Sequence, residues 1–179
     1  MTLAPSPRRT ILHTLLVIAV LITGFALDQL TKLWALNALA GGEELPILPT
    51  ISLRLAFNPG AAFGLGAESG PALAVGVLAL MLGLTGWIIY RLLRASPLLG
   101  TLLLTAVAAG GWGNMFDRLT RGDGQFLSGH VVDFIAVDWF AIFNLGDVLT
   151  VAGITAWAIT LVVVPSPKTA KVLHDAPAS

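Results

Sequence analysis

The sequence predicts an all-α integral membrane protein with four transmembrane helices and a small β-containing region in its extracytoplasmic loops. Hydrophobic residues make up 56% of the 179 residues and charged residues 11%, whereas a soluble domain has roughly 25% charged residues. The mean hydropathy is +0.86. Four apolar segments approach the length of about 20 residues that a helix needs to cross a bilayer. No linker separates them, so we expect a single membrane-embedded domain over residues 1–179.

The expected spans follow the apolar segments in chain order. They cover about residues 11–27, 72–90, 98–115 and 143–164. The first span follows two arginines, as the core of a secretory signal does. It is, however, longer than the roughly 7–15 residues of such a core, and no small-residue cleavage site follows it. We therefore interpret it as a retained span, and the polar segment 165–179 as a flexible cytoplasmic tail.

The basic residues predict the orientation of these spans. They lie before the first span, between the second and third, and after the fourth: Arg8, Arg9, Arg91, Arg94, Lys168 and Lys171. The positive-inside rule makes this side, with both termini, cytoplasmic. The loops 28–71 and 116–142 are then extracytoplasmic.

The first of these loops contains a pattern typical of a β-strand. Four apolar residues alternate with less apolar ones: Ile51, Leu53, Leu55 and Phe57. A period of two predicts a short, half-buried strand, whose apolar face lies either on the membrane surface or against the helices. The turn residues Asn58-Pro59-Gly60 end it.

The polar residues of the spans gather at one depth. Ionisable residues cost about 2.5–3.5 kcal/mol each at the centre of a membrane, so they are usually paired or functional. Here they lie at the outer span ends or in the second outer loop: Asp28, Lys32, Asn114, Asp117, Arg118, Asp133, Asn144 and Asp147. A single depth indicates a site at the interface and disfavours a transporter or channel, which needs polar groups at several depths. A non-catalytic scaffold, in which such residues join the helices, stays open.

Asp133 and Asp147 differ from the other acids because both lie within apolar runs. Neither has a lysine or arginine three or four residues away. Burial without a partner raises the pKa of a carboxyl group, and two such groups close together share one proton. A water molecule between them can then attack a carbonyl group, so the pattern predicts an aspartic hydrolase.

Other chemistries find less support in the sequence. The chain has no cysteine, which excludes disulfides and thiol catalysis. Its three histidines, His13, His130 and His174, are far apart and form no His-Glu-x-x-His motif, so we expect neither metal nor cofactor. Ser69-Gly70 and Ser128-Gly129 favour turns over a serine nucleophile. The formal net charge is zero, so no nucleic-acid partner is expected.

Five sequence blocks carry a resemblance to a known family. They are Asp28–Lys32, Phe57–Gly64, Gly110–Arg118, Val131–Phe134 and Phe143–Asp147. In this order, at these separations and with four expected spans, they resemble the bacterial lipoprotein signal peptidases, also called signal peptidase II. The resemblance covers residues 28–147.

The resemblance implies a membrane aspartic endopeptidase of the bacterial cytoplasmic (inner) membrane, with its active site on the extracytoplasmic side. It would remove signal peptides from diacylglyceryl-modified prolipoproteins by cleaving just before the lipid-modified cysteine, acting as a monomer among membrane lipids. Asp133 and Asp147 would be the catalytic pair. The supporting polar shell would be Asp28, Lys32, Asn58, Gly60, Asn114, Arg118 and Asn144. Asp117 would fix Arg118 or a helix end.

The sequence departs from the family pattern at two places. Gly146 stands where the family usually has alanine. Glycine destabilises the start of a helix by roughly 0.5–1 kcal/mol relative to alanine. The segment between Arg118 and Asp133 is long, and a turn is expected at 121–125. Asp138 is the acid most easily confused with the pair. We also expect Gly110, Gly111 and Gly113 to admit the apolar helix of a substrate between the spans.

Overall fold

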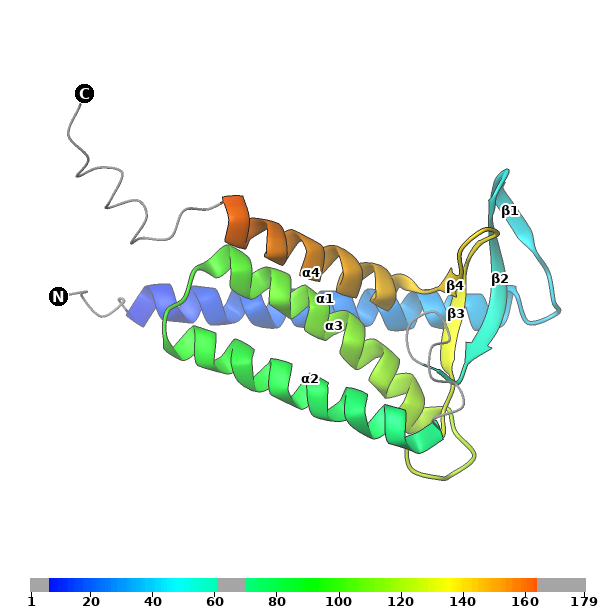
Figure 1. Ribbon diagram of the computed structural model, residues 1–179, viewed down its shortest axis with the longest axis horizontal. Helices are drawn as coiled ribbons and strands as arrows, with labels where there is room; N and C mark the ends of the chain where they lie inside the picture. The colour runs from blue at the N-terminus through cyan, green and yellow to red at the C-terminus, as the bar shows by residue number, and fades with distance from the viewer. Residues whose placement is uncertain (1–6, 61–69, 164–179) are drawn as a thin grey trace.

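The computed structural model describes residues 7–60 and 70–163. Within them, four helices lie side by side and a four-stranded antiparallel sheet covers one end of the bundle (Figure 1). The helices are α1 (Pro7–Ala38), α2 (Gly70–Leu93), α3 (Leu98–Thr120) and α4 (Leu145–Val163). The strands are β1 (Leu45–Leu48), β2 (Ile51–Asn58), β3 (Val131–Val137) and β4 (Ile142–Phe143).

All four helices are long and apolar enough to cross a membrane, which confirms the predicted number of spans in the described part of the chain. Two of them extend further toward the sheet than expected. Helix α1 continues to Ala38 and α3 to Thr120, beyond the expected membrane spans that end near Leu27 and Met115. The polar residues in these extensions are paired inside the bundle. The expected tail 165–179 lies outside the described residues.

Helix α3 occupies the centre of the bundle. In its apolar window 56% of the residues are buried, against 11–17% in the other three helices. Glycines bring its neighbours close: Gly24 of α1 faces Ala109, and Gly153 of α4 faces the backbone of Leu103 and Val107. Most side chains of the other helices are apolar and point away from the protein, as they do in a bundle surrounded by lipid.

The sheet has the order β1-β2-β3-β4 and packs on the C-terminal part of α1. The predicted strand at residues 51–57 is confirmed as β2. Its Leu53 and Leu55 lie against a cluster that includes Leu39 and Phe134, so its apolar face packs on the helices. A bulge between Leu53 and Ala56 interrupts the alternation, and Phe57 is exposed as a result.

Strand β3 follows directly from the end of α3 through the segment 121–130. The turn expected there is present: the Ser128 hydroxyl and the Gln125 N–H donate to Asp123 Oδ1, at 2.6 and 3.3 Å. The Gly129 N–H donates a hydrogen bond to the Arg118 carbonyl oxygen at 3.1 Å. This closed turn brings β3 back over the outer end of α3, so that Asp133 lies on a strand instead of in an irregular loop.

Candidate active site

Asp147 lies in the first turn of α4, where a reciprocal cap fixes its position. Strand β4 pairs with β3 and leads straight into the helix. Asn144 precedes the helix; its Oδ1 accepts the Asp147 N–H at 3.0 Å, and its own N–H donates to Asp147 Oδ2 at 3.2 Å. This is the geometry of a capping box, in which two backbone donors of the helix start are satisfied reciprocally.

The same asparagine reaches the second candidate carboxylate. Asn144 Nδ2 donates to Asp133 Oδ1 at 2.6 Å, and Asn58 Nδ2 of β2 donates to Asp133 Oδ2 at 3.0 Å. Asp133 is 2% exposed and Asn144 is fully buried, whereas Asp147 is only half-buried. The two aspartates predicted as a pair thus meet around one asparagine, although β3 and α4 contribute them separately.

Asn114 of α3 connects this centre with a buried lysine. Its Nδ2 donates to Asp147 Oδ1 at 2.9 Å, while its Oδ1 accepts from Lys32 Nζ at 2.7 Å and from Asn144 Nδ2 at 3.0 Å. A lysine can only donate, so it fixes the orientation of the Asn114 amide. The NH2 end of the Asn114 side chain therefore points at Asp147.

Lys32 also forms two buried ion pairs. Its Nζ lies 2.9 Å from Asp28 Oδ2 and 2.9 Å from Asp117 Oδ2, and all three side chains are inaccessible to solvent. Asp28 Oδ1 accepts the Gly146 N–H of α4 at 2.8 Å. Asp117 Oδ2 accepts the Val132 N–H of β3 at 3.2 Å. The network therefore joins α1 and α3 to the two elements that carry Asp133 and Asp147.

The structure specifies the role of Asp117 and adds two residues to the site. Asp117 was expected to fix Arg118 or a helix end, and it pairs with Lys32 and with Arg121 at the end of α3, whose Nε lies 2.8 Å from Asp117 Oδ1. Gln29 Nε2 donates to the Gly113 carbonyl and to Asp28 Oδ2, both at 3.1 Å. Arg121 stands four residues after Asp117, and this helical spacing is the signal that could have revealed the pair.

Arg118 and Gly60 meet at the edge of the site. The Arg118 guanidinium donates to the Pro59 carbonyl at 3.2 Å and to the Gly60 carbonyl. The Gly60 N–H donates to Asn58 Oδ1 at 2.8 Å, which fixes the asparagine that contacts Asp133. By contrast, Asp138 is exposed in the turn after β3. Every residue expected in the polar shell thus lies in one connected cluster, from which Asp138 is separate.

The surroundings of Asp133 change its acidity. The pKa of Asp133 is raised to about 6, chiefly by burial and in part by the charge of Asp147, against the lowering effect of hydrogen bonds from Asn58 and Asn144 and of the charge of Lys32. A carboxyl group with this pKa can hold or release a proton near neutral pH, which general acid–base catalysis requires. The pair has the chemical properties needed to activate a water molecule.

The three glycines expected to admit a substrate helix are covered from within the protein. A side chain on Gly110 would meet the Gly146 carbonyl, one on Gly111 the Met81 thioether, and one on Gly113 the Asp28 carboxylate. They allow the helices of the bundle to approach one another. The surface of α3 that carries them is therefore closed to an incoming helix.

Comparisons with known proteins agree with this geometry. A family model described as Signal peptidase (SPase) II matches residues 18–163. A lipoprotein signal peptidase of Bifidobacterium adolescentis is 37% identical, over 87% of this chain and 80% of that protein. A lipoprotein signal peptidase of Mycobacterium avium is 36% identical, over 83% of this chain and 77% of that protein.

Solved structures show a similar fold. Two structures of a bacterial membrane enzyme align with TM-scores of 0.67 and 0.65 at 22% and 23% sequence identity. The first alignment covers 82% of this chain and 87% of the other, and the second covers 84% and 94%.

Proposed function

The chain belongs to the signal peptidase II family, and we propose that Asp133 and Asp147 are the two carboxylates that carry out its peptide-bond hydrolysis. Its activity is the removal of signal peptides from prolipoproteins, as an aspartic-type hydrolase of the bacterial inner membrane. The observation that carries the assignment is the position of Asn144, which bonds to both carboxylates at the outer end of the bundle.

The proposed reaction uses the pair as base and acid. The ionised carboxylate accepts a proton from a water molecule as the water oxygen bonds to the scissile carbonyl carbon. The protonated carboxyl group donates a hydrogen bond to the carbonyl oxygen and stabilises the charge that develops there. Collapse of the tetrahedral intermediate breaks the C–N bond, and the amine leaves with the proton that the base took up. No covalent enzyme intermediate is required.

The polar shell keeps this pair in position. Asn58 and Asn144 hold the carboxyl oxygens of Asp133, and Asn114, oriented by Lys32, holds Asp147. Asp28 anchors the start of α4 through the Gly146 N–H. Because these donors are already fixed by further contacts, the pair needs little reorganisation during the reaction.

The charges of the helix ends support an orientation with the site outside the cytoplasm. Arg8 and Arg9 begin α1, and Arg91 and Arg94 lie where α2 ends, at the end of the bundle opposite the sheet (Figure 1). By the positive-inside rule this end, with both termini, faces the cytoplasm. We propose that the chain acts as a single monomeric domain surrounded by lipid. Its substrates carry a diacylglyceryl group on a cysteine and are cleaved just before it.

Two substitutions test the catalytic assignment. Asp133→Asn and Asp147→Asn each remove an ionisable group while retaining the shape of the side chain, so both variants should fold and neither should cleave. Asp138→Asn is the matched control, because Asp138 is exposed and separate from the cluster. The assay mixes purified protein in detergent with a diacylglyceryl-modified precursor and follows the shortened product. Normal cleavage by either pair variant would contradict the proposal.

A further inference from the structure

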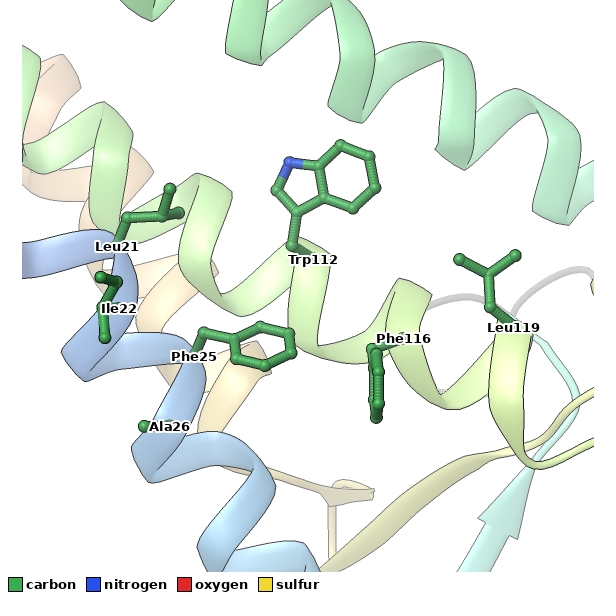
Figure 2. A pocket seen from close by; sticks show the side chains of 7 residues that line it. All are labelled: Leu21, Ile22, Phe25, Ala26, Trp112, Phe116 and Leu119. Carbon is green, nitrogen blue, oxygen red and sulfur yellow. The ribbon is translucent and has the colours of Figure 1, made fainter. Parts of the chain in front are cut away.

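The recesses on the surface of the bundle differ in the chemistry of their walls. The groove between α1 and α3 in Figure 2 is lined by apolar side chains, among them Phe25, Trp112 and Phe116. Its one polar side-chain atom, the indole Nε1 of Trp112, already donates to Thr85 Oγ1 at 3.0 Å. No side chain of that groove is left to select a polar ligand. A smaller recess, at the end of the bundle opposite the sheet, has charged walls instead.

This second recess lies between the start of α1 and the turn that joins α2 to α3 (Figure 1). It is lined by Arg9, Thr10 and His13 of α1 and, on the other side, by Leu92 and Ala95. Arg9 and His13 stand four residues apart and therefore share a helix face. Leu92 also packs against the core of the bundle. The basic recess, as we call it, thus has a basic wall on α1 and an apolar wall on α2.

Positive charge at this end of the bundle is not compensated by any described acidic residue. Arg8, Arg9 and Arg94 are exposed, and none of them forms an ion pair with another described residue. The described acidic residues all lie toward the sheet: Asp28, Glu43, Glu44, Asp117, Asp123, Asp133, Asp138 and Asp147. An anion in the basic recess would therefore be attracted by several cations without repulsion from a nearby carboxylate.

Arg91 differs from these cations because it is already engaged within the protein. Its Nε donates to Thr101 Oγ1 at 3.1 Å and its Nη2 to the Pro97 carbonyl oxygen at 3.3 Å. Its guanidinium also lies 5.8 Å from the centre of the Trp87 ring. These contacts hold the turn between α2 and α3, whose own backbone hydrogen bonds close the last turn of α2. One wall of the basic recess is thus preformed, and Arg9 on the other wall remains to meet a ligand.

The depth of the basic recess matches the headgroup layer of a bilayer. From Arg9 to Asp28 helix α1 rises about 28 Å at 1.5 Å per residue, close to the hydrocarbon thickness of about 30 Å. Trp87, Tyr90 and Trp157 lie near the same end, and the rings of the two tryptophans are 5.4 Å apart. Such residues collect at membrane interfaces. Because Asp28 belongs to the catalytic cluster at one interface, the basic recess lies at the other.

We propose that the basic recess binds the headgroup of an anionic phospholipid. Arg9 pairs with the lipid phosphate, while Thr10 and His13 offer a hydroxyl group and an imidazole N–H as further donors. Leu92 faces the apolar part of the lipid, whose acyl chains run along the bundle. Basic recesses between helices on the cytoplasmic side are a known type of lipid headgroup site. In the proposed orientation this lipid belongs to the cytoplasmic leaflet, and because it binds the folded protein it stabilises the contact of α1 with the α2–α3 turn.

The test follows thermal unfolding of the purified protein in detergent by circular dichroism while lipid is added. Dioleoylphosphatidylglycerol should raise the unfolding midpoint until it saturates, whereas dioleoylphosphatidylcholine, with the same chains and no net charge, should not. Glycerol 3-phosphate, which has the anion without the chains, should leave the midpoint unchanged. Arg9→Gln should weaken binding of the anionic lipid about fivefold, the contribution of one basic residue near an anionic membrane.

Arg8→Gln is the matched control. It removes the same charge from the neighbouring residue, which is exposed but does not line the basic recess, so the affinity for the anionic lipid should stay within about twofold of wild type. Equal weakening by Arg8→Gln and Arg9→Gln would overturn the inference, because it would assign the effect to the general charge of this end.

Two other results would also overturn the inference. Equal stabilisation by both lipids would mean that only the acyl chains are bound, and equal stabilisation by glycerol 3-phosphate would mean a site for a soluble anion. Precursor cleavage by Arg9→Gln in detergent should equal that of wild type, because the basic recess lies at the other end of the bundle from the catalytic pair; a loss of cleavage would contradict this separation. Failure of the proposed catalytic role is recognised separately, as cleavage that persists in Asp147→Asn.

Discussion

Replacing Lys32 by methionine removes the cation on which the site is built while keeping a side chain of similar length. The ammonium group lies 2.9 Å from carboxylate oxygens of both Asp28 and Asp117, and 2.7 Å from Asn114 Oδ1, with no exposure to solvent. Removing one partner of a buried ion pair costs about 3–5 kcal/mol, because the remaining charge stays buried and unpaired. A folded protein is stable by about 5–15 kcal/mol, so Lys32→Met should lose a large part of its free energy of unfolding.

The same substitution should also change the pH dependence of cleavage. The charge of Lys32 lowers the pKa of Asp133, which is about 6 in its presence. Without the ammonium charge the pKa of Asp133 rises further, so the pair keeps its one proton up to a higher pH. The alkaline limb of the kcat/KM profile should therefore move to higher pH. A purely structural role of Lys32 would lower stability without moving this limb.

The assay combines thermal unfolding in detergent, followed by circular dichroism, with a pH–rate profile. Arg54→Met is the matched control, because Arg54 is exposed on β2 and its removal deletes a positive charge from the same end of the molecule. In the double variant Lys32→Met/Asp28→Asn the carboxylate that has lost its cation is gone, whereas Asp117 keeps Arg121, so it should be more stable than Lys32→Met alone. A Lys32→Met protein as stable as the Arg54→Met control, with an unmoved alkaline limb, would refute the argument.

Three further outcomes follow from the site. Cleavage by the wild-type protein should fall as the pH is raised above about 6, because the pair needs one proton and Asp133, beside the ionised Asp147, loses it with a pKa of about 6; a profile that stays flat above this pH would contradict this. Arg121→Gln should lower the free energy of unfolding by about 1.5–3 kcal/mol, because it removes the 2.8 Å bond to the buried Asp117 carboxylate. Arg121→Lys should restore part of that loss in the same chemical unfolding series. Gly146→Ala places a methyl group 2.9 Å from Asp28 Oδ1 and from the Gly110 carbonyl oxygen. It should therefore lower the free energy of unfolding by about 1–3 kcal/mol and slow cleavage. Unchanged stability and rate would contradict this, because they would mean that the contact between α3 and α4 relaxes freely.

The sequence was sufficient to predict the membrane class and most residues of the cluster, but not Gln29 or Arg121. Apolar length identified the four spans, and Asp28 and Lys32 stand four residues apart, so their pairing on one helix face follows from helix geometry. The pairing of Lys32 with Asp117 did not follow in the same way. These residues belong to different helices, and only the packing of α1 on α3 brings them together. The burial of these polar residues beyond the expected spans did not follow either, since it depends on the same long-range pairing.

The sheet illustrates a second limit. Alternation predicted β2, but it did not reveal the bulge between Leu53 and Ala56 that leaves Phe57 exposed. The apolar run around Asp133 gave no period of two, because β3 is covered on both faces over most of its length. A strand of this kind has no distinctive sequence pattern. Its identity depends on its neighbours β2 and β4, which are far away along the chain.

The charges of the network provide a reason for the pair to hold a single proton. Within the described residues the connected cluster contains four carboxylates and three cations: Asp28, Asp117, Asp133 and Asp147, with Lys32, Arg118 and Arg121. If all of them were ionised, one negative charge would remain uncompensated in a largely buried cluster, which is costly. Lys32 and Arg121 already compensate Asp28 and Asp117, and Arg118 compensates one further carboxylate. The remaining charge is removed at least cost by a proton on the pair, where Asp133 has a pKa of about 6. One ionised and one protonated carboxyl group are the state that the reaction needs, so the packing that buries the network also sets the protonation of its catalytic pair.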